Sequence, residues 1–157
     1  MRTIDKIIIH CSATPEGRDV TVEEIRKWHV EERGWSDIGY HIIIYRDGSV
    51  HEGRPLERMG AHTRGENKGS VGICYIGGVE AKKMKGKWVS KDTRTIEQKE
   101  ALLDMLSYFK NLNPNAKVYG HRDFSTKDCP SFDAKTEYEF ISQMYDHLDF
   151  SDDDCCV

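Results

Sequence analysis

Long apolar runs are missing from this 157-residue chain. No stretch approaches the ~20 consecutive apolar residues that span a bilayer, so we expect no membrane-spanning segment and no membrane partner. The first ten residues, MRTIDKIIIH, also lack the basic and apolar regions of a secretory signal. We therefore expect cytoplasmic synthesis, so that any action outside the cytoplasm requires another route of release or delivery.

An excess of positive charge is also missing. The formal net charge is -4, from 23 basic and 27 acidic residues. Four of the acidic residues are aspartates that follow Leu148, which leaves residues 1–148 with 23 charges of each sign. Because nucleic-acid-binding proteins usually carry an excess of Lys and Arg, we expect no nucleic acid partner. The length predicts one domain over residues 1–148, followed by an acidic, flexible tail over residues 149–157.

The paired cysteines that stabilise small secreted domains are not evident either. The five cysteines make an odd number, and Cys155 and Cys156 are adjacent in the acidic tail, where a structural disulfide is difficult to form. We therefore predict a protein of a reducing compartment, in which one cysteine has a chemical role and the others are buried or incidental.

Hydrophobic periodicity predicts one α/β domain with a mixed central sheet of about five strands flanked by three main helices. Thr21 with Glu24, and Thr95 with Gln98, form capping boxes that begin the first two helices. Apolar residues at helical spacing predict a last helix that extends to Leu148. Short runs rich in β-branched residues predict strands over residues 6–10, 40–45, 50–53, 70–76 and 117–119.

A lysine-rich segment separates the fourth predicted strand from the second helix. Around Trp88 it carries six basic residues, Lys82, Lys83, Lys85, Lys87, Lys91 and Arg94. Such a charge run is usually a solvated loop or a small hairpin. A patch for an anionic partner is the alternative, and the sequence leaves both open.

Three of the seven histidines, His10, His62 and His121, lie at predicted strand ends or in loops. Catalytic zinc needs three protein ligands and a fourth position for water or substrate, and His10, His121 and Cys129 can supply that set. Lys127 favours the thiolate form of Cys129, which lies two residues further on. The spacing of these residues does not by itself establish a zinc site, because no local zinc motif such as HExxH is present. The alternatives are a His10 that caps a strand and a Cys129 that acts as a small buried hydrophobe.

Four motifs occur in order along the chain: IIIHCSAT, WSDIGYHIIIYRDGSVHEGRP, GAHTRGENKGSVGICYIGG and GHRDFSTKDCPSFD. Through them the chain resembles the phage lysozyme-type N-acetylmuramoyl-L-alanine amidases, type-2 zinc amidases that share their fold with the peptidoglycan recognition proteins. The likeness extends from about Ile4 to Leu148. It implies hydrolysis of the amide bond between N-acetylmuramic acid and L-alanine of the peptidoglycan stem peptide, with lysis of the bacterial cell wall as the result.

The same resemblance implies roles for individual residues. Tyr40 and Lys127 match the pair needed for hydrolysis, and His62 matches a position in the substrate groove. Amide hydrolysis passes through a tetrahedral oxyanion, and a phenol and an ammonium group are suited to stabilise this charge or to relay a proton. The resemblance also implies a single Zn²⁺ with one water and three protein ligands, His10, His121 and Cys129.

Three alternatives remain open. A non-catalytic peptidoglycan-binding module of the same fold would lack the cysteine ligand, so the presence of Cys129 argues against it. A cysteine hydrolase would use Cys11 or Cys129 as nucleophile and a histidine as base. The third alternative is binding of another protein, as in phage relatives that inhibit an RNA polymerase. We expect the protein to be a monomer.

Overall fold

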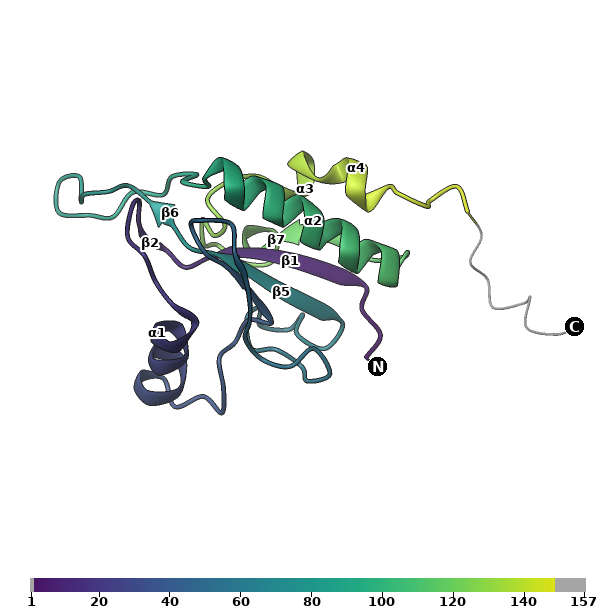
Figure 1. Ribbon diagram of the computed structural model, residues 1–157, viewed down its shortest axis with the longest axis horizontal. Coiled ribbons are helices and arrows are strands. Elements are labelled where there is room, and N and C mark those ends of the chain that lie inside the picture. Colours follow the sequence, from purple (N-terminus) through teal and green to yellow (C-terminus); the bar gives the residue numbers. More distant parts are fainter. Residues whose placement is uncertain (1, 149–157) are drawn as a thin grey trace, which may run out of the picture.

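A mixed five-stranded sheet forms the centre of the protein. The structure, a computed structural model, describes residues 2–148 (Figure 1), so the tail predicted for residues 149–157 lies outside the described residues. The central strand β1 pairs in parallel with β5 and β7, whereas β3 pairs in parallel with β5 and antiparallel with β4. The predicted mixed sheet is therefore confirmed. In spatial order its strands are β4 (Val50–Glu52), β3 (Ile42–Ile44), β5 (Ser70–Tyr75), β1 (Lys6–Cys11) and β7 (Lys117–Gly120).

The remaining elements are short, apart from one long helix. Two parallel strands, β2 and β6, form a separate small sheet. Within residues 2–148 no helix is long and apolar enough to cross a membrane. These elements are β2 (Thr14–Pro15), α1 (Val22–Lys27), the π-helical turn η1 (Trp28–Glu32), β6 (Gly78–Val79), α2 (Ile96–Leu112), the 3-10 turn η2 (His121–Asp123), α3 (Ala134–Glu137) and α4 (Glu139–Ser142).

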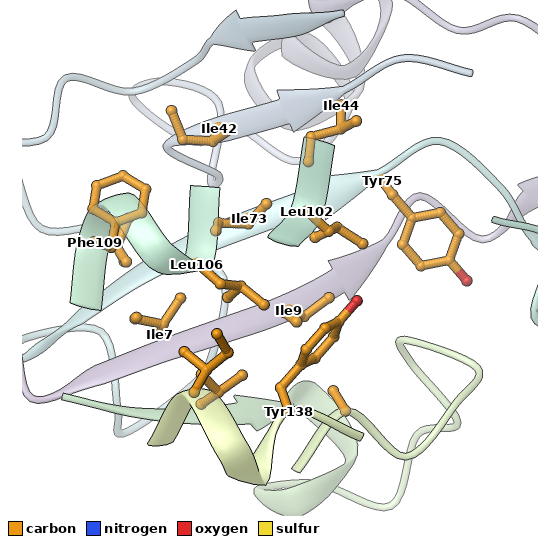
Figure 2. Close-up of a cluster of buried hydrophobic side chains, with 14 of the residues drawn as sticks. Ile7, Ile9, Ile42, Ile44, Ile73, Tyr75, Leu102, Leu106, Phe109 and Tyr138 are labelled. Carbon is orange, nitrogen blue, oxygen red and sulfur yellow. The ribbon is translucent and has the colours of Figure 1, made fainter. Parts of the chain in front are cut away.

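Both faces of the sheet are covered, which explains the continuous apolar runs of its central strands. Side chains alternate between the two faces, so Ile9 of β1 points toward α2 while the adjacent His10 points toward the opposite face. On that opposite face Ile25 of α1 packs with Ile43 of β3. Figure 2 shows the cluster beneath α2, which includes Ile7, Ile9, Ile73, Leu102, Leu106 and Phe109.

Both predicted capping boxes are present. The hydroxyl of Thr21 accepts a hydrogen bond from the backbone N–H of Glu24, and the Glu24 carboxylate accepts one from the N–H of Thr21. Thr95 and Gln98 form the same reciprocal pair at the start of α2. Each motif satisfies backbone N–H groups that the first helical turn leaves without a partner.

The predicted last helix is interrupted. Tyr138 lies between α3 and α4 with φ -106° and ψ 21°, and Tyr145 has a φ of 70°. The hydroxyl of Tyr138 accepts a hydrogen bond from Arg94, 2.9 Å away, and its buried ring lies near Phe132. Because these contacts hold Tyr138 in a non-helical conformation, helical spacing of apolar residues does not produce a continuous helix here. The prediction of one helix extending to Leu148 is wrong.

The lysine-rich segment forms a small hairpin, in which antiparallel bridges join Val79 to Ser90 and Met84 to Lys87. Arg94, which the sequence grouped with this basic segment, is buried instead. Its guanidinium forms ion pairs with Asp92 and Glu137 and lies over the ring of Phe132. Arg94 therefore holds the start of α2 to α3 and adds nothing to a basic surface. The exposed basic residues of the hairpin are Lys82, Lys83, Lys85 and Lys87.

Candidate metal centre and active site

Parallel pairing of β1 and β7 brings His10 and His121 together. The register pairs Ile9 with Gly120, so the histidine that follows each of these residues lies at the same edge of the sheet. Their ring centroids are 4.7 Å apart. The Sγ of Cys129 lies 3.8 Å from the Nδ1 of His10. One ligand atom from each of these three residues lies within 4.8 Å of the other two, and no other such group occurs in the described part of the chain.

The loop that carries Cys129 is fixed by backbone contacts. The carbonyl of Cys129 accepts a hydrogen bond of 2.7 Å from the N–H of Arg122. The next residue, Pro130, follows a cis peptide bond, and its carbonyl accepts a 2.6 Å hydrogen bond from the hydroxyl of Tyr75. The Sγ of Cys129 accepts the backbone N–H of Cys11 at 3.3 Å. These contacts hold the thiol against the end of β1.

The charge states of these side chains suit a metal cation. Burial, with smaller contributions from His62, His121 and Lys127, lowers the pKa of His10 well below its usual value. Burial and then Lys127 lower the pKa of His121. Both imidazoles are thus held in the neutral form that binds metals.

The thiol of Cys129 does not have the lowered pKa that the nearby Lys127 predicts. Its hydrogen bond with Cys11 and its burial raise the pKa of Cys129. Formation of the thiolate at neutral pH therefore requires a cation that replaces the proton. Two imidazole nitrogens and one thiolate sulfur form a donor set typical of zinc, and the three residues fit that ion.

Tyr40 and Lys127 lie beside the three candidate ligands. The ring centroid of Tyr40 is 5.1 Å from that of His10, and burial raises the pKa of its phenol well above the usual value. Tyr40 is thus a hydrogen-bond donor at neutral pH. Lys127 is exposed, and it lines the same cavity as Tyr40, His121 and Cys129.

Two adjoining cavities form the groove at this site. The smaller, of about 180 Å³, contains Cys129, and the larger, of about 400 Å³, extends to Arg64. Tyr40 and Lys127 are among the residues that line both. No acidic side chain lines either cavity within the described part of the chain, whereas Arg33, Arg64 and Lys127 do. The groove is therefore suited to a substrate that carries negative charge.

His62 lines the larger cavity, but the residue as a whole is only 8% exposed. Its Nδ1 lies 2.8 Å from the Nε2 of His10, and its Nε2 lies 3.2 Å from the Oγ of Ser70. Both ring nitrogens therefore have partners within the protein. A contact between His62 and substrate stays a prediction.

Sequence reasoning missed several residues of the groove. Neither His29 nor Trp35 is among the candidate site residues that the sequence indicates, yet both line the larger cavity. The Nδ1 of His29 accepts the N–H of Gly39 at 2.9 Å, and its ring packs against Trp35 and Tyr40. His29 and Trp35 lie close to Tyr40 in the sequence, and this proximity was the signal that could have assigned them to the groove. For Arg33 there was none, because an exposed arginine is ordinary.

The chain is similar in sequence and in fold to several known proteins. The family described as N-acetylmuramoyl-L-alanine amidase matches residues 1–132. The endolysin of Klebsiella phage KP32 is 43% identical over 134 residues, covering 85% of each chain. Among solved structures, bumblebee PGRP-SA superposes with a TM-score of 0.71 at 29% identity, covering 88% of this chain and 82% of that one. The N-acetylmuramoyl-L-alanine amidase LysC of Clostridium intestinale gives 0.71 at 26% identity, covering 87% and 82%. The chain belongs to the N-acetylmuramoyl-L-alanine amidase family.

Proposed function

We propose that the protein is a zinc-dependent amidase that hydrolyses the bond between N-acetylmuramic acid and L-alanine of the peptidoglycan stem peptide. The amidase activity follows from the family. The observation that supports zinc dependence is the convergence of His10, His121 and Cys129, whose ligand atoms lie within 4.8 Å of one another. Cys129 belongs to that cluster. A non-catalytic binding module of this fold would lack this cysteine.

When bound, zinc held by these three residues would supply a Lewis acid and would make water acidic enough to give a nucleophile near neutral pH. The surrounding residues favour this role. His10 and His121 are neutral, so that each imidazole has one ring nitrogen with a free lone pair for the cation. Lys127 lies at the rim of the same cavity and faces solvent, where its charge is available to substrate.

Tyr40 and Lys127 are proposed to stabilise the reaction's negative charge. When the scissile carbonyl becomes tetrahedral, its oxygen acquires negative charge. The Tyr40 hydroxyl, protonated at neutral pH, donates a hydrogen bond to that oxygen. The Nζ of Lys127, which lines the same cavities, offers a second donor, this one positively charged, and it can pass a proton to the departing amine of L-alanine. His62 is proposed to border the groove next to these residues.

Digestion of purified sacculi tests the reaction directly. The intact protein is incubated with sacculi, and the soluble products are analysed by mass spectrometry. The proposed reaction releases free stem peptides that begin with L-alanine and leaves the glycan strands intact. Binding to sacculi with no released peptide would identify a non-catalytic module instead. Cleaved glycan strands, or peptides cut at another bond, would contradict the proposed specificity.

Peptidoglycan is the substrate of the family, and the protein is proposed to act on the bacterial cell wall. Synthesis in the cytoplasm followed by release through a membrane pore or by lysis is part of the same proposal. A monomeric state and a protein partner such as a polymerase stay predictions. Light scattering tests the first, and a pull-down from host extract tests the second.

A further inference from the structure

The two ring nitrogens of His10 face different surroundings. Nδ1 lies 3.8 Å from the Sγ of Cys129, on the side of the three candidate ligands. Nε2 points away from that cluster and lies 2.8 Å from the Nδ1 of His62. Nδ1 is therefore the nitrogen of His10 available to a metal.

His62 is held by contacts on every side. Its backbone N–H donates to the Oδ1 of Asn67 at 2.9 Å, and its Nε2 lies 3.2 Å from the Oγ of Ser70. A Cβ added at either Gly60 or Gly72 would lie 2.6 Å from carbons of the ring, so these glycines make the space that the ring occupies. These contacts and the space beside the two glycines together hold the His62 imidazole in one position.

Metal binding through Nδ1 of His10 would determine where each proton along these contacts lies. A neutral imidazole carries one N–H, so a His10 that offers the lone pair of Nδ1 must carry its proton on Nε2. That N–H donates to the Nδ1 of His62, which places the proton of His62 on its own Nε2. The Nε2–H of His62 then donates to Ser70, whose hydroxyl faces the carbonyl of Asn67 at 3.5 Å. Every donor in this chain meets an acceptor.

A neighbouring hydroxyl lies beside the contact between the two imidazoles. The Oγ1 of Thr63 lies 2.9 Å from the Nδ1 of His62 and 3.3 Å from the Nε2 of His10. Thr63 is itself buried, so the contact between the two imidazoles is shielded from water. Competition from solvent for the N–H of His10 is thereby reduced.

We propose that His62 is a positioning residue that fixes His10 in the tautomer whose Nδ1 is free to bind the metal. The proposal rests on the metal site of the proposed function. Histidine ligands of metals generally donate their second N–H to a carboxylate, a backbone carbonyl or water. A neutral imidazole in this place orients His10 without adding negative charge near the cation, which preserves the Lewis acidity that amide hydrolysis uses.

Matched substitutions separate this role from simple packing. In His62→Asn the side-chain oxygen can take the place of Nδ1 and accept from His10. In His62→Gln the polar atoms lie further out, near the place of Nε2, and His62→Leu has no polar atom. His51→Asn is the control, because His51 lies on β4, where its ring stacks on Tyr45. Zn²⁺ affinity is measured for each purified protein by competition with a chelator.

We expect His62→Leu and His62→Gln to lose about 10–100-fold in Zn²⁺ affinity. His62→Asn should remain within a few-fold of the unmodified protein, and His51→Asn should be unchanged. Equal losses in all three His62 variants would indicate a packing role and overturn the proposal. Unchanged affinity in His62→Leu would overturn it as well. Failure of the unmodified protein to bind Zn²⁺ would instead remove the proposed metal site, and this inference with it.

A measurement without substitutions guards against variants that fail to fold. In ¹⁵N-labelled, metal-free protein, the nitrogen shifts and couplings of His10 report which ring nitrogen carries the proton. We expect the proton of His10 on Nε2, and that of His62 also on Nε2. A proton found on the Nδ1 of His10 would overturn the proposal whatever the affinities of the variants.

Discussion

The Sγ of Cys129 lies 3.8 Å from the Nδ1 of His10, although 119 positions separate the two residues in the chain. Parallel pairing of β1 with β7 brings His10 and His121 to one edge of the sheet. A hydrogen bond from Arg122 to the Cys129 carbonyl then returns the loop to that edge. The site thus depends on the tertiary fold, and substitutions at single residues can test its parts separately.

Cys129→Ala is expected to lose bound metal and hydrolysis together. The substitution removes the one sulfur ligand and leaves two neutral imidazoles, which bind zinc far more weakly than a set of three ligands. Metal content of the purified variant checks this expectation. Cys74→Ala, a buried cysteine outside the cluster of three ligands, should keep its metal. Normal zinc content in Cys129→Ala would show that the ligand set is wrong.

Lys127→Ala is expected to keep the metal and lose most of the hydrolysis. Lys127 lies at the cavity but outside the cluster of ligand atoms. Loss of one donor to the oxyanion typically lowers kcat by ~10²–10³. Metal content and release of L-alanine peptides are measured on the same sample, with Lys82→Ala on the exposed hairpin as the control. A variant with full activity would exclude Lys127 from the reaction.

Tyr40→Phe removes only a hydroxyl from the partly buried ring beside His10. We expect kcat to fall by ~10²–10³ while KM and metal content change little, because the hydroxyl acts on charge that develops in the transition state. Steady-state kinetics on a soluble muropeptide give both constants. Tyr108→Phe, at an exposed tyrosine of α2, should match the unmodified enzyme. A rise in KM alone would assign Tyr40 to substrate binding.

Acid should destabilise the protein through His41. Burial lowers the pKa of His41 to about 4, from an ordinary value of about 6.5. Between these two values the unfolded chain binds a proton that the folded chain does not, so the free energy of unfolding falls as pH decreases. The shift corresponds to about 3 kcal/mol between neutral pH and pH 4.

His41→Asn isolates this contribution. The asparagine oxygen can still accept the N–H of Gly72, which the Nδ1 of His41 accepts at 3.0 Å, but it does not titrate. Denaturant unfolding at several pH values gives the difference between the two proteins, so the effects of other groups cancel. The difference should change across pH 6.5 to 4. A difference that is constant with pH would mean that the pKa of His41 is the same in the folded and unfolded states.

The sheet could be predicted because its central strands are buried on both faces and therefore appear as unbroken apolar runs. The capping boxes at Thr21 and Thr95 were equally direct, since each is a local motif. The last helix was not predictable from its spacing. Tyr138 is held by Arg94, 44 positions away, and no local pattern reports that contact.

The candidate ligands were identifiable from motif order, whereas the groove around them was not. Spacing could not show that His10 and His121 meet, because that depends on the register between Ile9 and Gly120. The contact between His10 and His62 was also hidden. It depends on the room left beside Gly72, which only the packed structure reveals.

Removal and return of zinc tests the central claim most directly. The intact protein is treated with a chelator, dialysed and assayed for release of L-alanine peptides from sacculi, before and after Zn²⁺ is added back. We predict complete loss of activity on chelation and its recovery with about one Zn²⁺ per chain. Activity that survives chelation but is lost on alkylation of cysteine would contradict the account and favour a thiol nucleophile.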